Sequence, residues 1–260
     1  MKRFIYLSVF LLCVSVLQAQ DFSKYERFAF IQSGDTLPYR ILLPENYDAS
    51  YEYPLVIFLH GRGESGRDNE KQLSLGAGAL FLKDSLRKAF PAIVVFPQCA
   101  ADDYWSNVQT VADKTGKRHF YFVPDGEPSE SMRLLTGLAD NLFRQYKIKK
   151  TQVYVMGLSM GGMGTFELVR RKPGMFAAAV AICGGADPAT ADKIKQTNWW
   201  VFHGDRDETV PPEHSEKIVA ALKKVMAKVQ FTVYKGVHHN SWEKAFAEPG
   251  LLPWLFSNKK

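Results

Sequence analysis

Cysteine is scarce in this sequence. Only three cysteines occur among 260 residues, and Cys13 falls in the apolar stretch near the N-terminus. The other two, Cys99 and Cys183, are too few for a disulfide framework, so we predict two buried free thiols. No cysteine–histidine spacing resembles a zinc site, and the six histidines contain no H-E-x-x-H pair. These absences argue against a metal centre.

Long apolar runs are also missing, except at the N-terminus. Residues 1–3 carry basic charge, residues 4–17 are almost continuously apolar, and small and polar residues follow. This order predicts a secretory signal with Ala19 as the last residue removed, and therefore export to the periplasm or the medium. The alternative is a membrane anchor, but the run is short for a span. Lipid attachment at Cys13 is disfavoured because leucine precedes it, where a small residue is normally required.

The sequence has no long run of charge of one sign. Its formal net charge is +6, and removal of residues 1–19, which contain Lys2 and Arg3, would leave +4. The basic residues are scattered among acidic ones, and no basic stripe alternates with aromatic residues, so we expect no nucleic-acid partner. The apolar share of 46% excludes a wholly disordered chain. Nothing here indicates an oligomeric state.

What the chain does contain is a series of short apolar runs. The segments 27–31 and 37–43, with turn residues between them, predict an antiparallel hairpin. Six further runs are apolar without strict alternation, as expected of strands buried on both faces. They lie at 55–59, 92–96, 153–156, 177–182, 199–202 and 231–234.

Helical patterns separate these runs. Apolar residues recur at helical spacing within 131–146 and 213–230. A hairpin followed by buried strands that alternate with helices predicts an α/β fold, with a mostly parallel sheet of about eight strands and helices on both faces. No linker or repeat interrupts the pattern, so we expect residues 20–260 to form a single domain.

The segment at about 100–128 fits this scheme less well. It is long for a connection, and it contains Tyr104, Trp105 and the aromatic stretch 119–123. It is either a packed surface excursion or a lid or wall over a pocket, and both interpretations remain open.

A glycine-rich motif follows the run at 153–156. The segment 157–161 matches G-x-S-x-G, which a random chain of this length would contain about one time in ten. Its context is more specific, because residues 165–171 continue as a helix. A serine on such a turn exposes its hydroxyl at the carboxyl edge of the sheet, and the helix N-terminus favours a developing anion. We therefore predict that Ser159 is a nucleophile.

A serine nucleophile needs a base and a carboxylate that orients the base. In this architecture both should come later in the chain, the acid first, at the carboxyl ends of strands. One of the predicted strands is followed by Asp205 and Asp207, and the next by His238 and His239. Each pair could instead cap a turn, but three polar sites in this order favour catalysis. The order alone does not choose within either pair.

Two backbone N–H groups should stabilise the oxyanion. One belongs to Met160, the residue after the nucleophile, and the other should come from the loop after the strand at 55–59. That loop is rich in glycine, and its best candidate is the main-chain N–H of Arg62. We expect His60 to support the turn.

Together these segments resemble the α/β-hydrolase superfamily. More narrowly, they are similar to exported carboxylesterases of the phospholipase/carboxylesterase and dienelactone-hydrolase-like group, over residues 37–256. The motifs that carry the resemblance are FLHGRGESG at 58–66, FPQ at 96–98 with Trp105, VMGLSMGG at 155–162, FAAA at 176–179, ICGG at 182–185, HGDRDETVP at 203–211 and GVHHNSW at 236–242.

The resemblance implies the α/β-hydrolase fold and a choice within each pair. Enzymes of this group take their acid from a G-x-x-D-x-x-V-P pattern, which starts at Gly204 and implies Asp207. Their base directly precedes Asn-Ser-Trp, which implies His239. His238 stands where relatives commonly carry glycine, so the swapped assignment stays open. The group needs no cofactor.

The function implied by the resemblance is that of a secreted or periplasmic serine ester hydrolase. It would act through a Ser-His-Asp triad and an acyl-enzyme on a small-molecule or polysaccharide-linked ester, with acetyl and feruloyl groups as candidates. The alternatives are a small serine peptidase of the prolyl-oligopeptidase type and a catalytically silent binding protein on the same scaffold. We expect Trp105, Trp242 and residues 120–122 to shape the substrate pocket.

Overall fold

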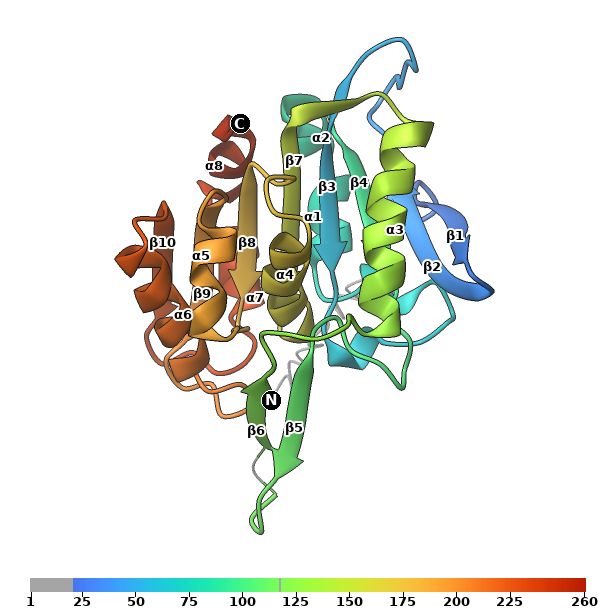
Figure 1. Ribbon diagram of the computed structural model, residues 1–260. Helices are drawn as coiled ribbons and strands as arrows, with labels where there is room; N and C mark the ends of the chain where they lie inside the picture. The colour runs from blue at the N-terminus through green and yellow to red at the C-terminus, as the bar shows by residue number, and fades with distance from the viewer. Residues whose placement is uncertain (1–20, 117) are drawn as a thin grey trace, which may run out of the picture.

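The computed structural model of the protein describes residues 21–116 and 118–260 (Figure 1). The predicted signal segment, including Cys13 and Ala19, lies outside these residues. Within the described residues, no helix combines the length and the apolar character needed to cross a membrane.

The core of the fold is an eight-stranded sheet in the order β1-β2-β4-β3-β7-β8-β9-β10. Strands β1 and β2 form the predicted antiparallel hairpin, β2 pairs with β4 in the antiparallel sense, and all other pairs are parallel. The prediction of a mostly parallel sheet of about eight strands is therefore confirmed. The strands are β1 (Glu26–Gln32), β2 (Asp35–Leu42), β3 (Tyr53–Leu59), β4 (Ile93–Pro97), β7 (Ile148–Leu158), β8 (Ala178–Ile182), β9 (Asn198–Gly204) and β10 (Val229–Tyr234).

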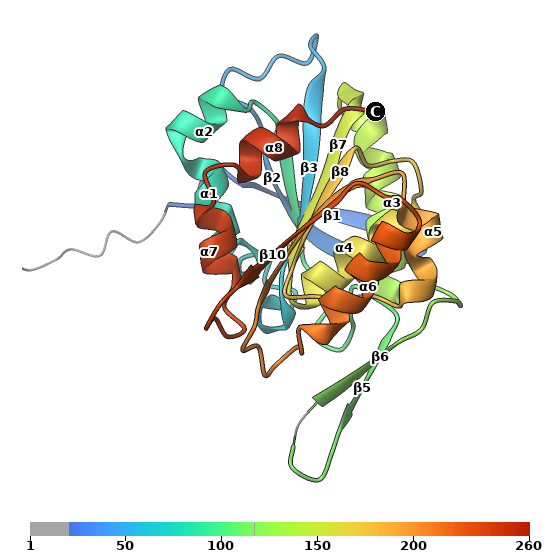
Figure 2. The same cartoon turned by 90° about the vertical axis from the view of Figure 1, so that its left-hand side faces the viewer.

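Helices cover both faces of the sheet (Figure 2). One face carries α3 (Glu130–Gln145), α4 (Met160–Arg171), α5 (Ala191–Ile194) and α6 (Glu213–Lys224). The other carries α1 (Ala77–Leu82), α2 (Asp84–Ala89), α7 (Trp242–Ala247) and α8 (Leu251–Ser257).

Strand β3 shows why the buried strands lack alternation in sequence. Leu55, Ile57 and Leu59 belong to the apolar cluster beneath α3 and α4, whereas Val56 and Phe58 belong to the cluster on the other face. Because both faces are covered, every position of the strand must be apolar.

The helix predicted at 213–230 ends early, at Lys224. Met226 adopts a left-handed φ of 58° and its side chain is 91% exposed. The N–H of Ala227 bonds to the carbonyl oxygen of Leu222 at 3.0 Å, and Val229 already begins β10. The predicted helix was too long because the apolar spacing continues past the end of α6 into the first residues of β10.

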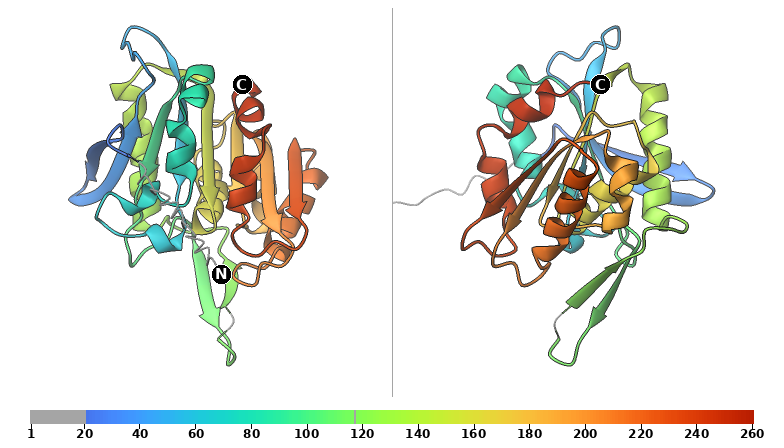
Figure 3. Two further views of the ribbon diagram at one scale, coloured as in Figure 1. Left: turned by 180° about the vertical axis from the view of Figure 1, so that it is seen from behind. Right: turned by 60° about the vertical axis from the view of Figure 1, so that its left-hand side comes forward.

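Both described cysteines are confirmed as free and buried: Cys99 and Cys183 form no disulfide. The segment at 100–128 contains a separate two-stranded hairpin, β5 (Val108–Ala112) and β6 (Arg118–Phe122). Figures 1 and 3 show this hairpin standing out from the body beyond the carboxyl ends of the parallel strands.

Candidate active site

Ser159 lies on the sharp turn between β7 and α4. Its backbone takes φ 55° and ψ −119°, a region that residues with a Cβ rarely adopt. The N–H of Ser159 donates to the carbonyl oxygen of Ile182 at 2.8 Å, which fixes the turn to β8. A Cβ on Gly157 would collide with the carbonyl of Gly161, and one on Gly161 would collide with β3. Both glycines are therefore required by the close approach of backbone.

The structure brings one histidine and one carboxylate to this serine. Nε2 of His239 lies 2.9 Å from Oγ of Ser159, and Nδ1 of His239 lies 2.7 Å from Oδ2 of Asp207. The other two candidates lie elsewhere: Asp205 accepts the N–H of Gly236 at 2.6 Å, and His238 is exposed. Of the two pairs, Asp207 and His239 are thus the residues that form a chain of hydrogen bonds with Ser159: Asp207 contacts His239, and His239 contacts the serine.

Asp207 is buried, and hydrogen-bond donors surround its carboxylate. Oδ1 accepts the N–H groups of Thr209 and Val210, both at 2.9 Å. Oδ2 faces His239 and also Nε2 of His203, at 3.2 Å. Burial acts to raise the pKa of Asp207, but the hydrogen bonds from His203 and His239, the His239 charge and the Val210 N–H outweigh it and hold the pKa below its usual value. Asp207 is therefore ionised at neutral pH.

His203 is the site residue that the sequence reasoning did not single out. It is the last residue but one of β9 and is fully buried. The sequence could have indicated it, because His203 stands four residues before Asp207 in the motif at 203–211. That motif supported only the resemblance and the choice of Asp207.

His60 braces the loop that follows β3. Its Nδ1–H donates to the carbonyl oxygen of Gly61 at 2.6 Å, and its Nε2 accepts the N–H of Cys99 at 2.9 Å. Burial lowers the pKa of this imidazole to about 4, although the Gly61 carbonyl opposes the shift. His60 is therefore a neutral support of the turn.

The two expected oxyanion donors lie beside the serine. Met160 is the first residue of α4, where an N–H has no partner within its helix. Arg62 begins the short 3₁₀ helix η1 (Arg62–Glu64), and both residues line the cavity that contains Ser159. The Arg62 guanidinium is held at 2.9 Å from the carbonyl oxygen of Asp103 and lies over the Tyr104 ring. The side chain is thus engaged, which leaves the main-chain N–H as the expected donor.

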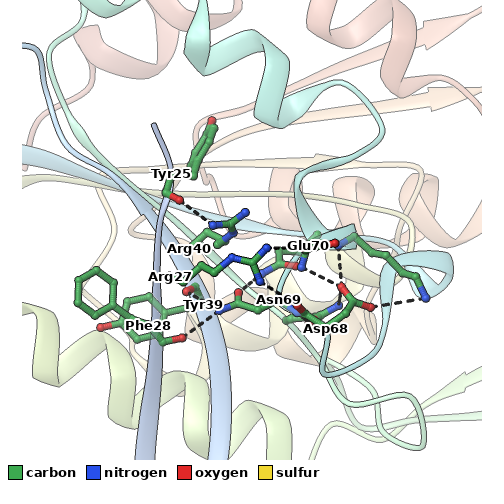
Figure 4. A network of polar contacts seen from close by, with 11 residues as sticks. Tyr25, Arg27, Phe28, Tyr39, Arg40, Asp68, Asn69 and Glu70 are labelled. Atoms are coloured by element: carbon green, nitrogen blue, oxygen red, sulfur yellow. Dashed lines mark hydrogen bonds and ion pairs between the residues drawn. The ribbon is translucent and has the colours of Figure 1, made fainter. Parts of the chain in front are cut away.

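A polar network ties the continuation of this loop to the β1–β2 hairpin (Figure 4). Nδ2 of Asn69 donates to the carbonyl oxygens of Phe28 at 3.1 Å and Tyr39 at 3.3 Å. Arg27 forms an ion pair with Glu70. These contacts attach the segment after η1 to the edge of the sheet and so limit its movement.

The cavity at Ser159 has a volume of about 460 Å³, within the range of small-molecule sites. Its walls include Tyr104, Phe120 and Trp242, with Arg118 of the β5–β6 hairpin on one side. The hairpin therefore contributes a wall of the cavity. A more open hollow of about 780 Å³ lies at the opposite end of the strands, between Tyr53, Phe90 and Phe256. The residues that line this hollow include no histidine, and they include none of Ser159, Asp207 and His239.

Only some of the residues that we expected in the pocket line the cavity. Trp242 lines the cavity, with its ring 5.4 Å from that of His239. Phe120 also lines it, whereas Tyr121 is 57% exposed.

The prediction for Trp105 was wrong. Its side chain is fully buried, outside the cavity wall, with its ring 5.4 Å from that of His60. The physical reason is Gly164 of α4: its missing side chain leaves the space that Trp105 fills. The neighbouring Tyr104 lines the cavity instead.

Cys183, Asp207 and His239 bring three potential metal-ligand atoms within 4.8 Å of one another. Two of these side chains, Asp207 and His239, already share a hydrogen bond. Burial raises the pKa of the Cys183 thiol, which disfavours the thiolate that a metal would need. The donor set does not fit a metal site well, and we assign none.

The chain matches the sequence model of one protein family, and many solved structures are similar to it. The sequence model described as Phospholipase/Carboxylesterase matches residues 48–248. A structure described as a thermostable esterase is similar, with 30% identity and a TM-score of 0.82 over 92% of this chain. The chain spans 64% of that esterase's length. A search of curated proteins gave no match.

Two structures of lower identity share the fold. A ferulic acid esterase from Anaeromyces mucronatus, in complex with ferulic acid, is 15% identical, with a TM-score of 0.65 over 93% of each chain. A variant of the feruloyl esterase module from Clostridium thermocellum, complexed with sinapinate, is 13% identical, with a TM-score of 0.64 over 90% of this chain and 88% of its own. These likenesses are evidence of a shared α/β-hydrolase architecture.

Proposed function

The chain belongs to the phospholipase/carboxylesterase family, and on this premise we propose that it hydrolyses carboxylic esters through an acyl-enzyme formed on Ser159. The observation that carries the proposal is the hydrogen-bonded chain from Asp207 through His239 to Ser159, with contacts of 2.7 and 2.9 Å. The contact of 2.9 Å suits proton transfer between the serine hydroxyl and the imidazole, and the contact of 2.7 Å orients the imidazole.

The chemistry follows from these contacts. Oγ of Ser159 attacks the acyl carbon while Nε2 of His239 takes its proton, and Asp207 stabilises the imidazolium that results. The N–H groups of Met160 and Arg62 stabilise the tetrahedral oxyanion. His239 then protonates the leaving alcohol, and in the second half-reaction it activates the water that releases the acid.

We propose an ester with an acetyl or feruloyl group, attached to a small molecule or a polysaccharide, as the substrate. The aromatic rings of Tyr104, Phe120 and Trp242 in the cavity wall support an aromatic acyl group. The fold shared with two feruloyl esterases is consistent with that choice.

The test is the intact mass of residues 20–260 after treatment with a fluorophosphonate, beside the variant Ser159→Ala. This reagent reports an activated serine without requiring the acyl preference to be known. We expect one adduct on the wild type and none on the variant. A folded wild type that forms no adduct would contradict the proposal and favour the silent binding protein.

Chromogenic acetyl, butyryl and feruloyl esters, assayed beside peptide anilides, separate the esterase from the peptidase alternative. We expect turnover of esters and little turnover of anilides. Faster hydrolysis of anilides would favour a peptidase of the prolyl-oligopeptidase type.

We also propose that the protein is exported, on the basis of the basic, apolar and small-residue regions of residues 1–21. Expression of the full chain in a secreting bacterium tests this. Export predicts a mature product whose mass corresponds to a start at Gln20. A product that keeps residues 1–19 and stays inside the cell would contradict it.

A further inference from the structure

A second imidazole contacts the proposed catalytic carboxylate. His203 is completely buried, and its Nε2 lies 3.2 Å from Oδ2 of Asp207 and 2.9 Å from the carbonyl oxygen of Val210. Its Nδ1 lies 2.7 Å from Oγ of Ser215. The ring thus has close polar neighbours on both nitrogens.

These neighbours fix the protons of the ring. A carboxylate and a carbonyl are acceptors only, so Nε2 must carry a proton. Oγ of Ser215 lies 2.7 Å from the carbonyl oxygen of Gly184, a contact that requires the serine to donate its hydroxyl proton there. The serine oxygen can then only accept from the ring, so Nδ1 of His203 must carry a proton as well.

We infer that both ring nitrogens of His203 carry protons in the folded protein, so that this imidazolium shares the carboxylate of Asp207 with His239 and acts as a positioning residue for the proposed ester hydrolysis. The positive charge compensates the buried Asp207 carboxylate, which would be costly to leave unpaired. It also reduces the negative field that Asp207 exerts on His239.

The other titratable groups near His203 do not supply this charge. Cys183, which directly follows β8, has a thiol whose pKa burial raises, so it is neutral. His214, on α6, has its pKa lowered by burial, by Lys217 and by His203 itself, against the opposing effect of Glu213. Asp207 and His239 complete the surroundings. Asp207 is thus the carboxylate that contacts His203, and His203 is the buried cation on its far side.

The charge state is tested directly by ¹⁵N NMR of the histidine rings in residues 20–260. At about pH 8, above the usual histidine pKa, we expect both ring nitrogens of His203 to carry protons. The variant Ser215→Ala, which perturbs the Nδ1 partner and keeps the ring, assigns the resonances, as does His203→Gln where it folds. A His203 nitrogen without a proton at this pH would overturn the inference. This measurement needs no activity, so it stands apart from the test of ester hydrolysis.

The positioning role is tested by the pH profile of kcat/KM on an ester substrate. In His203→Gln the full field of Asp207 acts on His239, so the acidic limb should move to higher pH by roughly one unit. His238→Gln, which removes an exposed histidine, is the matched control and should leave the limb in place. A uniform loss of kcat/KM with an unmoved limb would reduce His203 to a packing residue and overturn the proposed role.

Discussion

Individual residues of the site differ in how their protons are fixed. His60 faces one N–H donor and one carbonyl acceptor, so a single neutral tautomer satisfies both contacts. His239 faces a carboxylate on one side and a hydroxyl on the other, so it can gain and lose a proton. His60, His239 and His203 therefore have three different roles, and the difference comes from their hydrogen-bond partners.

Replacing Asp207 by asparagine should lower kcat by about 10⁴. The amide would turn an N–H₂ group toward His239 or lose a contact, and the imidazole would adopt the wrong tautomer. Steady-state kinetics on the best ester measures this. Asp205→Asn is the matched control, since Asp205 is exposed and bonds to Gly236. A larger loss in the control would show that the acid had been misassigned.

The two adjacent histidines give a second comparison. His239→Ala should lower kcat by roughly 10⁴–10⁶, because the serine loses its base. His238→Ala should keep kcat close to that of the wild type, since this side chain is exposed and Nε2 of His239 already contacts Ser159. The reverse order of effects, measured on the same ester, would establish the swapped assignment.

At the scale of elements, the β5–β6 hairpin determines one wall of the cavity. It stands at the carboxyl edge of the sheet, where the loops after β3, β7, β9 and β10 meet. Phe120 packs against Met163 and Val210 and lines the cavity, whereas its neighbour Tyr121 points outward. The hairpin can therefore influence substrate choice without taking part in the chemistry.

Phe120→Ala should lower kcat/KM for a feruloyl ester by about tenfold or more, and for an acetyl ester much less. Contact with a buried phenyl ring contributes about 1.5–3 kcal/mol, which only an aromatic acyl group can use fully. Tyr121→Ala, on the exposed side of the same strand, is the control. An equal loss on both esters would mean that the hairpin does not select the acyl group.

Trp105→Ala should act on stability, with no selective effect on acyl preference. Its side chain fills the space beside Gly164 and His60, so truncation leaves a cavity that costs about 3–5 kcal/mol of the free energy of unfolding. Urea unfolding measures the loss, and the ratio of acetyl to feruloyl turnover shows any change in preference. A stable variant with an altered ratio would restore the original expectation.

The sequence predicted best those elements that are buried on both faces. Strands β3, β4, β7, β8 and β9 and the turn at Ser159 follow from apolar runs and glycines whose positions backbone contact dictates. The end of α6 could not be read, because Val225 and Val229 continue a helical pattern across a turn. The role predicted for Trp105 was wrong and His203 was not predicted, for a related reason: the places of both side chains depend on contacts with residues outside their own segments, Gly164 and Ser215 among them.

At the scale of the whole molecule, the site depends on the complete fold. Its residues come from loops after four strands, and the two apolar clusters on either side of the sheet hold those strands in register. Buried groups with displaced pKa values therefore link the protonation of the site to the stability of the protein.

His60 should make the free energy of unfolding fall as the pH drops from about 6.5 to about 4. The folded state keeps this imidazole neutral down to a pKa of about 4, whereas the unfolded chain takes up a proton near pH 6.5. The unfolded state therefore binds more protons in this window, and stability is lost as the pH falls through it. The difference in pKa corresponds to about 3 kcal/mol.

Urea unfolding of wild type and His60→Gln across this pH range measures the effect. The variant should be less stable at pH 7. Its free energy of unfolding should also fall less steeply between about pH 6.5 and pH 4, because the contribution of His60 is missing. Asp68 does not affect this comparison. Burial acts to raise its pKa, but backbone N–H groups, Gln98 and Lys71 lower the pKa to about 2. Its contribution to stability is therefore lost only below the usual carboxyl pKa, outside the range in which His60 acts. Equal slopes in the two proteins would show that His60 is not kept neutral by the fold, and would remove the contrast with His203.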